Sequence, residues 1–182
     1  MRIDDVLDFQ IYKDTDREAM AVSELIDKFE ELEFIPNLGK IIVVSNNKKK
    51  IKKELLEAGG ANVVTLTRIP PKYKGIISQL TSTEYTFCLE IVHSAFEDAE
   101  GGDEDQKLDF NQLKALMYFE LRKIRHDGKV GKIRANDWIR ILHGLGKGFD
   151  RLDTSCTDIL AEDFSWEKVL GSYDKSLEYE ED

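Results

Sequence analysis

Three short segments of this chain have the apolar pattern of β-strands. Residues 84–92 alternate between an apolar and a polar face. The apolar positions are Tyr85, Phe87, Leu89 and Ile91, and the polar positions are Glu84, Thr86, Cys88 and Glu90. Residues 40–47 are a continuous apolar run closed by Asn-Asn, and residues 61–70 are rich in β-branched side chains. The first run predicts a buried strand, and the second predicts a further strand.

Later segments repeat apolar residues at helical spacing. The strongest predicted helix covers residues 110–126, with apolar positions at Leu113, Leu116, Met117, Leu121 and Ile124. A second helix is predicted at about 136–144, and an earlier one at 22–35 that ends at Pro36. Residues 48–60 fit either a short basic helix or an extended loop. Strands grouped before two principal helices indicate an α+β fold, with a small mixed or antiparallel sheet of three or four strands packed on the helix 110–126.

Length, charge and cysteine content narrow the class of protein. The 182 residues suit one domain, so we predict an N-terminal arm over 1–20, a domain over 21–170 and a disordered acidic tail over 171–182. The net charge of −10 repels nucleic acid and anionic membranes from the molecule as a whole. Two distant cysteines make no disulfide framework, and no apolar run approaches the ~20 residues of a membrane span. We therefore expect a cytoplasmic protein with no membrane partner.

One carboxylate lies inside the apolar stripe of the helix 110–126. The helical register places Glu120 on the same face as Leu116, Met117 and Leu121. An unpaired buried carboxylate costs several kcal/mol. Three explanations stand: Glu120 reaches the rim of the core, it pairs with Lys123 or Arg122, or it is kept for chemistry.

The residues around Glu120 resemble a known family. The matching residues, in order, are Leu116-Met117-Tyr118, Glu120-Leu121, Ile124, Asp127-Gly128-Lys129, Asp137-Trp138, Ile141-Leu142 and Leu145-Gly146. This set is similar to the phage metallopeptidases, small proteins carried by phages and prophages, and flanking segments extend the resemblance to roughly residues 20–170. The resemblance implies a zincin-like fold whose His-Glu-x-x-His helix binds zinc, while the glutamate activates the metal-bound water.

The positions that correspond to the zinc ligands of that family hold other residues. Phe119 and Lys123 occupy the two positions of the helix, and Ile133 occupies the third. Glu120 remains at the position of the catalytic base. Phenylalanine and isoleucine do not bind zinc, and a lysine ammonium has no free lone pair. The chain therefore resembles a degenerate family member, a pseudoenzyme with no metal cofactor, and Lys123 either replaces the metal beside Glu120 or extends to solvent.

Two alternatives to this reading start from other residues. A displaced metal site would use His126 and Asp127 near the helix end, with zinc as cofactor, although no two histidines have a ligand spacing such as His-x3-His. Nucleic-acid binding would use the basic run of Lys48, Lys49, Lys50, Lys52 and Lys53. That run lacks interleaved aromatic residues, so a solvated surface is the simpler interpretation.

The expected function follows from the resemblance and from the lost ligands. We expect an inactive metallopeptidase-like protein of phage or prophage origin. It would act in the host cytoplasm by binding another protein, a host factor in particular.

Overall fold

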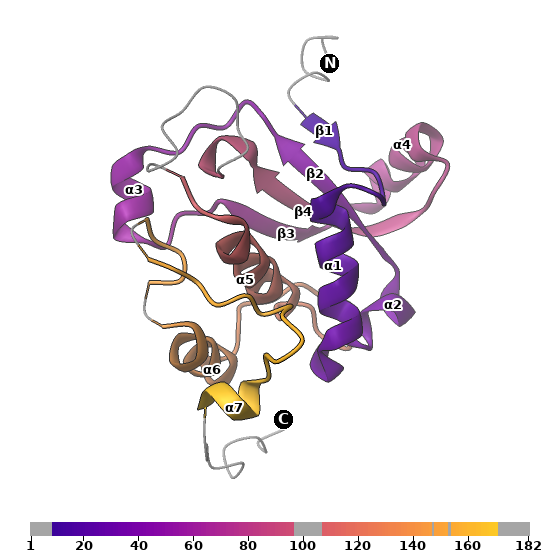
Figure 1. The fold of residues 1–182 in the computed structure, drawn as a ribbon. Helices are drawn as coiled ribbons and strands as arrows, with labels where there is room; N and C mark the ends of the chain where they lie inside the picture. The colour runs from indigo at the N-terminus through magenta and orange to yellow at the C-terminus, as the bar shows by residue number, and fades with distance from the viewer. Residues whose placement is uncertain (1–8, 97–106, 147, 153, 171–182) are drawn as a thin grey trace.

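The structure of the protein is a computed structural model, which describes residues 9–96, 107–146, 148–152 and 154–170. Its strands form one mixed sheet in the order β1-β2-β4-β3 (Figure 1). The strands are β1 (Phe9–Ile11), β2 (Lys40–Asn46), β3 (Val64–Arg68) and β4 (Tyr85–Val92). Strands β2 and β4 are parallel, while β1 and β3 are antiparallel to their neighbours. The predicted α+β class with a small mixed sheet is confirmed.

The sheet has a core face and an outer face. Phe87, Leu89 and Ile91 are at most 1% exposed and belong to the hydrophobic core, so the alternation predicted for β4 is confirmed. Side chains that are paired across neighbouring strands lie on the same face. The intervening positions, which include Val44 and Cys88, therefore point to the outer face.

Helices cover the core face of the sheet. Figure 1 shows α1 (Arg17–Lys28) and α5 (Phe110–Leu121) on this side. Helix α6 (Ala135–Leu145), predicted at about 136–144, lies beyond α5 together with α7 (Trp166–Leu170). Aromatic residues fill the space between these layers, since Phe29 and Tyr118 pack against Trp166.

The N-terminal part of the chain corrects one predicted helix boundary. Helix α1 is followed by a 3-10 helix (Glu30–Leu32) and by the short α2 (Ile35–Leu38). Pro36 lies in the first turn of α2 and does not end a helix, because the first turn tolerates proline. Strand β1 and the start of α1 fall within the arm predicted over 1–20. The tail predicted over 171–182 lies outside the described residues.

Helix α5 is shorter than the predicted 110–126 and ends at Leu121. The chain then folds back on itself, as Gly131 N–H donates to Lys123 O and Arg125 N–H donates to Lys129 O. Gly128 has a φ of +74°, a conformation that favours glycine, and makes this reversal possible. The apolar period continues to Ile124, but this local turn ends the helix first.

Two further helices flank the sheet. Helix α3 (Lys53–Ala58) decides the alternative left open for residues 48–60 in favour of a short helix followed by Gly59. Helix α4 (Pro71–Thr81) connects β3 to β4 and contains no buried residue. In Figure 1 it stands apart from α1 and α5, at one end of the sheet.

Candidate functional site

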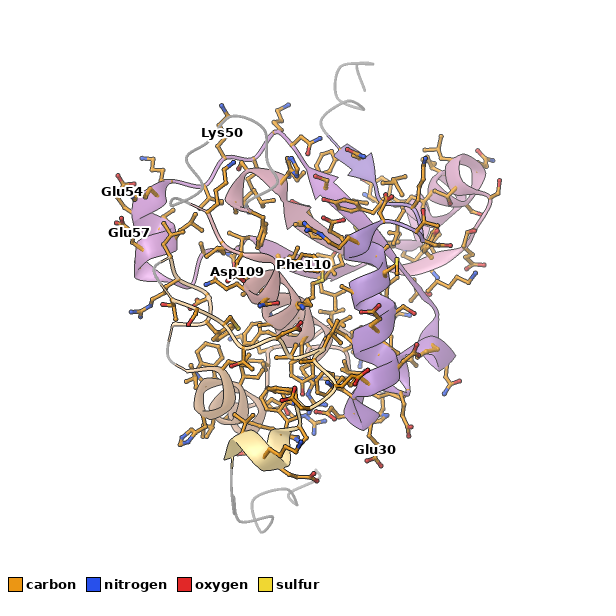
Figure 2. The ribbon with its side chains drawn as sticks, viewed as in Figure 1. Glu30, Lys50, Glu54, Glu57, Asp109 and Phe110 are labelled. Atoms are coloured by element: carbon orange, nitrogen blue, oxygen red, sulfur yellow. The ribbon has the colours of Figure 1, made fainter. Side chains whose placement is uncertain are left out.

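Helix α5 carries the candidate site, and its start is fixed by a capping box. The Asp109 side chain accepts the N–H of Gln112 at 2.7 Å, and the Gln112 side chain accepts the N–H of Asp109 at 3.0 Å. The Gln112 amide also donates to the carbonyls of Phe149 and Arg151. Figure 2 shows Asp109 and Phe110 at the N-terminal end of α5. The capping box thereby sets the register that directs Glu120 inward.

Glu120 is buried, with 6% of its surface exposed, and bonds to the edge strand β3. Its Oε2 accepts the backbone N–H of Leu66 at 3.0 Å. Just beyond the two ends of β3, Ile69 N–H donates to Thr86 O and Val63 O accepts from Val92 N–H. In this register, the odd-numbered residues of β3 direct their backbone N–H and C=O groups at β4. Bonding alternates along an antiparallel strand, so the N–H of Leu66 points to the open edge. Glu120 satisfies a donor that the sheet leaves unpaired.

Lys123 binds the other oxygen of the same carboxylate. Its Nζ forms an ion pair with Glu120 Oε1. The Lys123 side chain is 22% exposed and the Glu120 side chain is 8% exposed. The ammonium also lies 4.8 Å from the centre of the Phe119 ring, a cation–π distance. The pairing of Lys123 with Glu120 is thus observed, and the alternative in which Lys123 simply extends to solvent is wrong.

Phe119 is packed among other aromatic residues. Its ring lies edge-on to Trp138 of α6, with centroids 5.3 Å apart, and 6.3 Å from Phe149. Ile133, in the segment between α5 and α6, is half-buried and packs against the core. Apolar contacts therefore occupy two of the three positions where the resembling family has ligands.

The two ligand positions of the helix motif lie on either side of the end of α5. Phe119 lies in the helix, whereas Lys123 lies two residues beyond its end. Lys123 N–H donates to Glu120 O, and Ile124 N–H donates to Leu121 O, which are i to i+3 bonds. Histidines at i and i+4 share a metal because a continuous α-helix projects them from one face. Here the bonds tighten before Lys123, although the Lys123 ammonium still lies over the Phe119 ring.

The residues of the displaced metal site have other partners. The exposed His126 ring stacks on Phe34, with centroids 4.0 Å apart. Asp127 accepts the N–H of Lys129 at 2.9 Å, and this backbone bond lowers the pKa of its carboxyl. Asp127 also forms an ion pair with the Lys129 ammonium at 3.0 Å. Across the described ranges, no group of three or more His, Cys, Asp or Glu side chains is arranged to hold a metal ion.

The basic run between β2 and α3 is anchored by its own neighbours. The Asn46 side chain accepts the N–H groups of Lys48 and Lys49, and the Lys49 ammonium donates to Asn62 O at 2.8 Å. Lys53 pairs with Glu57 at 3.7 Å. Figure 2 shows Lys50 on the connection before α3 and acidic side chains, Glu54 and Glu57, on that helix. Lys50 and Lys52 are exposed. Nucleic-acid binding by this run stays a prediction that these contacts do not favour.

The sequence pattern does not predict a partly buried polar network beside the site. The Tyr118 hydroxyl donates to Glu31 Oε1, and the Arg122 guanidinium bonds to Asp137 and to Glu31 O. Burial raises the pKa of Tyr118 well above its usual value, and the nearby Glu31 carboxylate adds to this effect. Arg140 completes the network with an ion pair to Glu31 at 3.6 Å. Its members come from the 3-10 helix after α1, from the end of α5 and from α6. These segments are far apart in the sequence, so no local spacing predicts the network.

The chain was compared with protein-family models, with curated proteins and with solved structures, and no match is found. In the part of the chain that the structure describes, no helix has the length and apolar character to cross a membrane. The zincin-like fold and the phage metallopeptidase resemblance are therefore predictions from the residues quoted above.

Proposed function

We propose that this protein is a catalytically inactive, zincin-like relative of the phage metallopeptidases that acts by binding another protein. One observation carries the proposal, namely that both oxygens of Glu120 are engaged. A general base must meet the water it activates, whereas the Glu120 carboxylate is 6% exposed and already held by two donors. Oε1 faces the Lys123 ammonium, and Oε2 faces the N–H of Leu66. The carboxylate thus serves as a structural link between α5 and β3.

The surface above the packed site supplies a place for a protein partner. Trp138 and Ile139 of α6 are 37% and 41% exposed, although the Trp138 ring also contacts Phe119. Arg134 is exposed at the start of the same helix. Tryptophan and arginine are enriched among the residues that dominate interface energies. A surface that once held a peptide would, in this proposal, bind a protein without cleaving it.

The origin and the partner complete the proposal. From the resemblance we infer that the chain is of phage or prophage origin and that its partner is a host protein in the cytoplasm. The net charge of −10 favours a partner with a basic surface, because opposite charges speed association.

The proposal is tested by placing a photo-crosslinking amino acid at Trp138 in cells that naturally contain the protein. We expect one dominant crosslinked protein. The matched control is the same amino acid at Leu55 of α3, which is 52% exposed and distant in sequence from the site. Crosslinking of the same protein from both positions would contradict a specific surface at Trp138.

Catalytic inactivity is tested separately. Purified protein incubated with zinc is analysed for bound metal and assayed against unfolded protein substrates. We expect no peptide-bond cleavage above the level of a Glu120→Gln variant. Cleavage that Glu120→Gln abolishes would overturn the proposal, since it would show that Glu120 acts as a base.

A further inference from the structure

Helix α4 has an apolar stripe that no described element covers. Tyr73, Ile76 and Leu80 are 47%, 54% and 73% exposed, and Ile77 is half-buried. These positions follow the i, i+3, i+4, i+7 spacing of a helix face that is normally buried. Pro71 in the first turn and Thr81, whose hydroxyl donates to Ile77 O at 2.7 Å, stabilise the two ends of the helix. The stripe is thus presented on a well-formed helix.

A groove separates α4 from the outer face of the sheet. Its volume is about 270 Å³, and it is lined by Thr67, Ile69 and Cys88 from the sheet and by Tyr73, Ile76 and Ile77 from α4. Burial raises the pKa of the Cys88 thiol to about 11, so the thiol is neutral at physiological pH. Helix α4 is therefore a ridge, with an uncharged hollow beside it.

Strand β1 extends the apolar surface at the other edge of the sheet. Phe9 and Ile11 are 46% and 44% exposed, and their pairing with Asn46 and Val44 places them on the outer face. Together with Tyr73, Ile76 and Leu80 they form what we call the outer patch. Five of the ten exposed large apolar side chains among the described residues belong to it. This concentration on one face indicates an interface.

The size of the outer patch fits a dimer interface. Each of its five side chains presents on the order of 100 Å², or about 500 Å² in all. Apolar atoms make up roughly 57% of an ordinary interface, so about 500 Å² of apolar surface corresponds to just under 900 Å² in total. A stable interface takes about 800 Å² from each partner.

The charge of this face also fits a second copy of the chain. On α4 and the outer face, the described charged residues are Lys40, Lys72, Lys74, Glu84 and Glu90. Three lysines and two glutamates give a net charge of +1, so this face lacks the acidic excess of the whole chain, which carries −10. Two copies repel each other over most of their surface. The outer face is where that repulsion is weakest.

We propose that the protein forms a two-fold symmetric dimer through the outer patch. The ridge of α4 in each copy lies over β1 and the half-buried Val44 of β2 in the other copy, so one surface contacts itself. The groove beside α4 receives apolar side chains of the partner copy. This inference goes beyond the proposed function, because the outer patch shares no residue with the Glu120 site or with the Trp138 surface.

The experiment is sedimentation velocity on the full chain over a range of concentrations up to about 100 µM, a range that reveals micromolar dimers. We expect the mass to rise from that of one chain of 20.9 kDa to twice that value. Leu80→Glu should remain monomeric, because a carboxylate at 73% exposure is stable in the monomer but not in an apolar interface. Leu55→Glu on α3 is the matched control and should dimerise like the wild type.

Two results would overturn the proposal. One is a wild-type chain that stays monomeric throughout the concentration range. The other is a Leu80→Glu variant that dimerises as well as Leu55→Glu. Salt separates this interface from a charged one: raising the ionic strength from about 0.05 M to about 0.5 M shortens the screening length and should leave the dimer intact. Dissociation in salt would contradict an interface held together by apolar contacts.

Discussion

Glu120 Oε2 accepts the backbone N–H of Leu66 at 3.0 Å, which joins helix α5 to the open edge of β3. The two residues are 54 positions apart in the sequence. Lys123 neutralises the same carboxylate from the turn after the helix. A residue that stands at a catalytic position in a resembling family therefore has a structural role in this fold.

Replacing Lys123 with methionine should destabilise the protein. The variant leaves the Glu120 carboxylate buried without its cation, and we expect a loss of about 2 kcal/mol in the free energy of unfolding. Urea denaturation measures this loss. The double variant Glu120→Gln/Lys123→Met should recover part of it, because both charges are then removed. An unchanged transition midpoint in Lys123→Met would show that the ion pair contributes nothing.

Replacing Glu120 distinguishes its charge from its hydrogen bond to β3. Glu120→Leu leaves the N–H of Leu66 without an acceptor and should cost about 1–3 kcal/mol, whereas Glu120→Gln keeps a carbonyl acceptor and should cost less. Hydrogen exchange at the Leu66 amide is the measurement, and we expect faster exchange in Glu120→Leu than in Glu120→Gln. Equal exchange rates in the two variants would argue against the bond.

Restoring histidines at the three lost positions should not restore a zinc site. In the triple variant Phe119→His/Lys123→His/Ile133→His, position 123 still lies beyond the end of α5, in a turn with i to i+3 bonds. Histidines at i and i+4 share a metal when a continuous helix directs both rings at one point, and the tighter bonds before position 123 change that direction. We expect substoichiometric zinc by metal analysis and no rise in melting temperature with zinc. One tightly bound zinc per chain would show that α5 extends when metal is present.

The stability contributed by Asp158 should depend on pH. Burial raises the pKa of Asp158, but hydrogen bonds from the Lys114 ammonium and the N–H of Leu160 lower it more, so the net shift is downward. A carboxyl whose pKa is lower in the folded state stabilises the fold at pH values above its pKa in the unfolded chain, which is about 4. This contribution is lost as the pH falls through the folded-state pKa. Asp158→Asn should be less stable than the wild type at pH 7, and the difference should shrink below about pH 4.

Packing should override helix propensity at Gly144 of α6. In an exposed helix, glycine to alanine stabilises by about 1 kcal/mol. Here an added Cβ would lie 2.9 Å from Trp166 Cε3. Trp166 is buried among Phe29, Tyr118 and Phe164 and cannot easily move. We expect Gly144→Ala to lower the melting temperature, with a cost of about 1–3 kcal/mol from overpacking. A raised melting temperature would show that the Trp166 ring gives way.

Local pattern determined much of the fold. The alternation of residues 84–92 predicted β4 and its buried face, and the apolar period predicted α6 to within a residue. The helical register also placed Glu120 inward, where the structure finds it. These features depend on side chains a few positions apart, and so they are readable along the chain.

Tertiary structure alone decided what those side chains contact. The chain reversal at Gly128 ended α5 before its apolar period ended, and the open edge of β3 supplied the N–H donor whose hydrogen bond Glu120 accepts. The Tyr118–Glu31–Arg122 network joins segments nearly ninety residues apart. Helix α4 has the apolar spacing of a buried helix and yet lies exposed beside the sheet. Periodicity specifies which side of an element is apolar, but the partner that covers that side is set by the path of the whole chain.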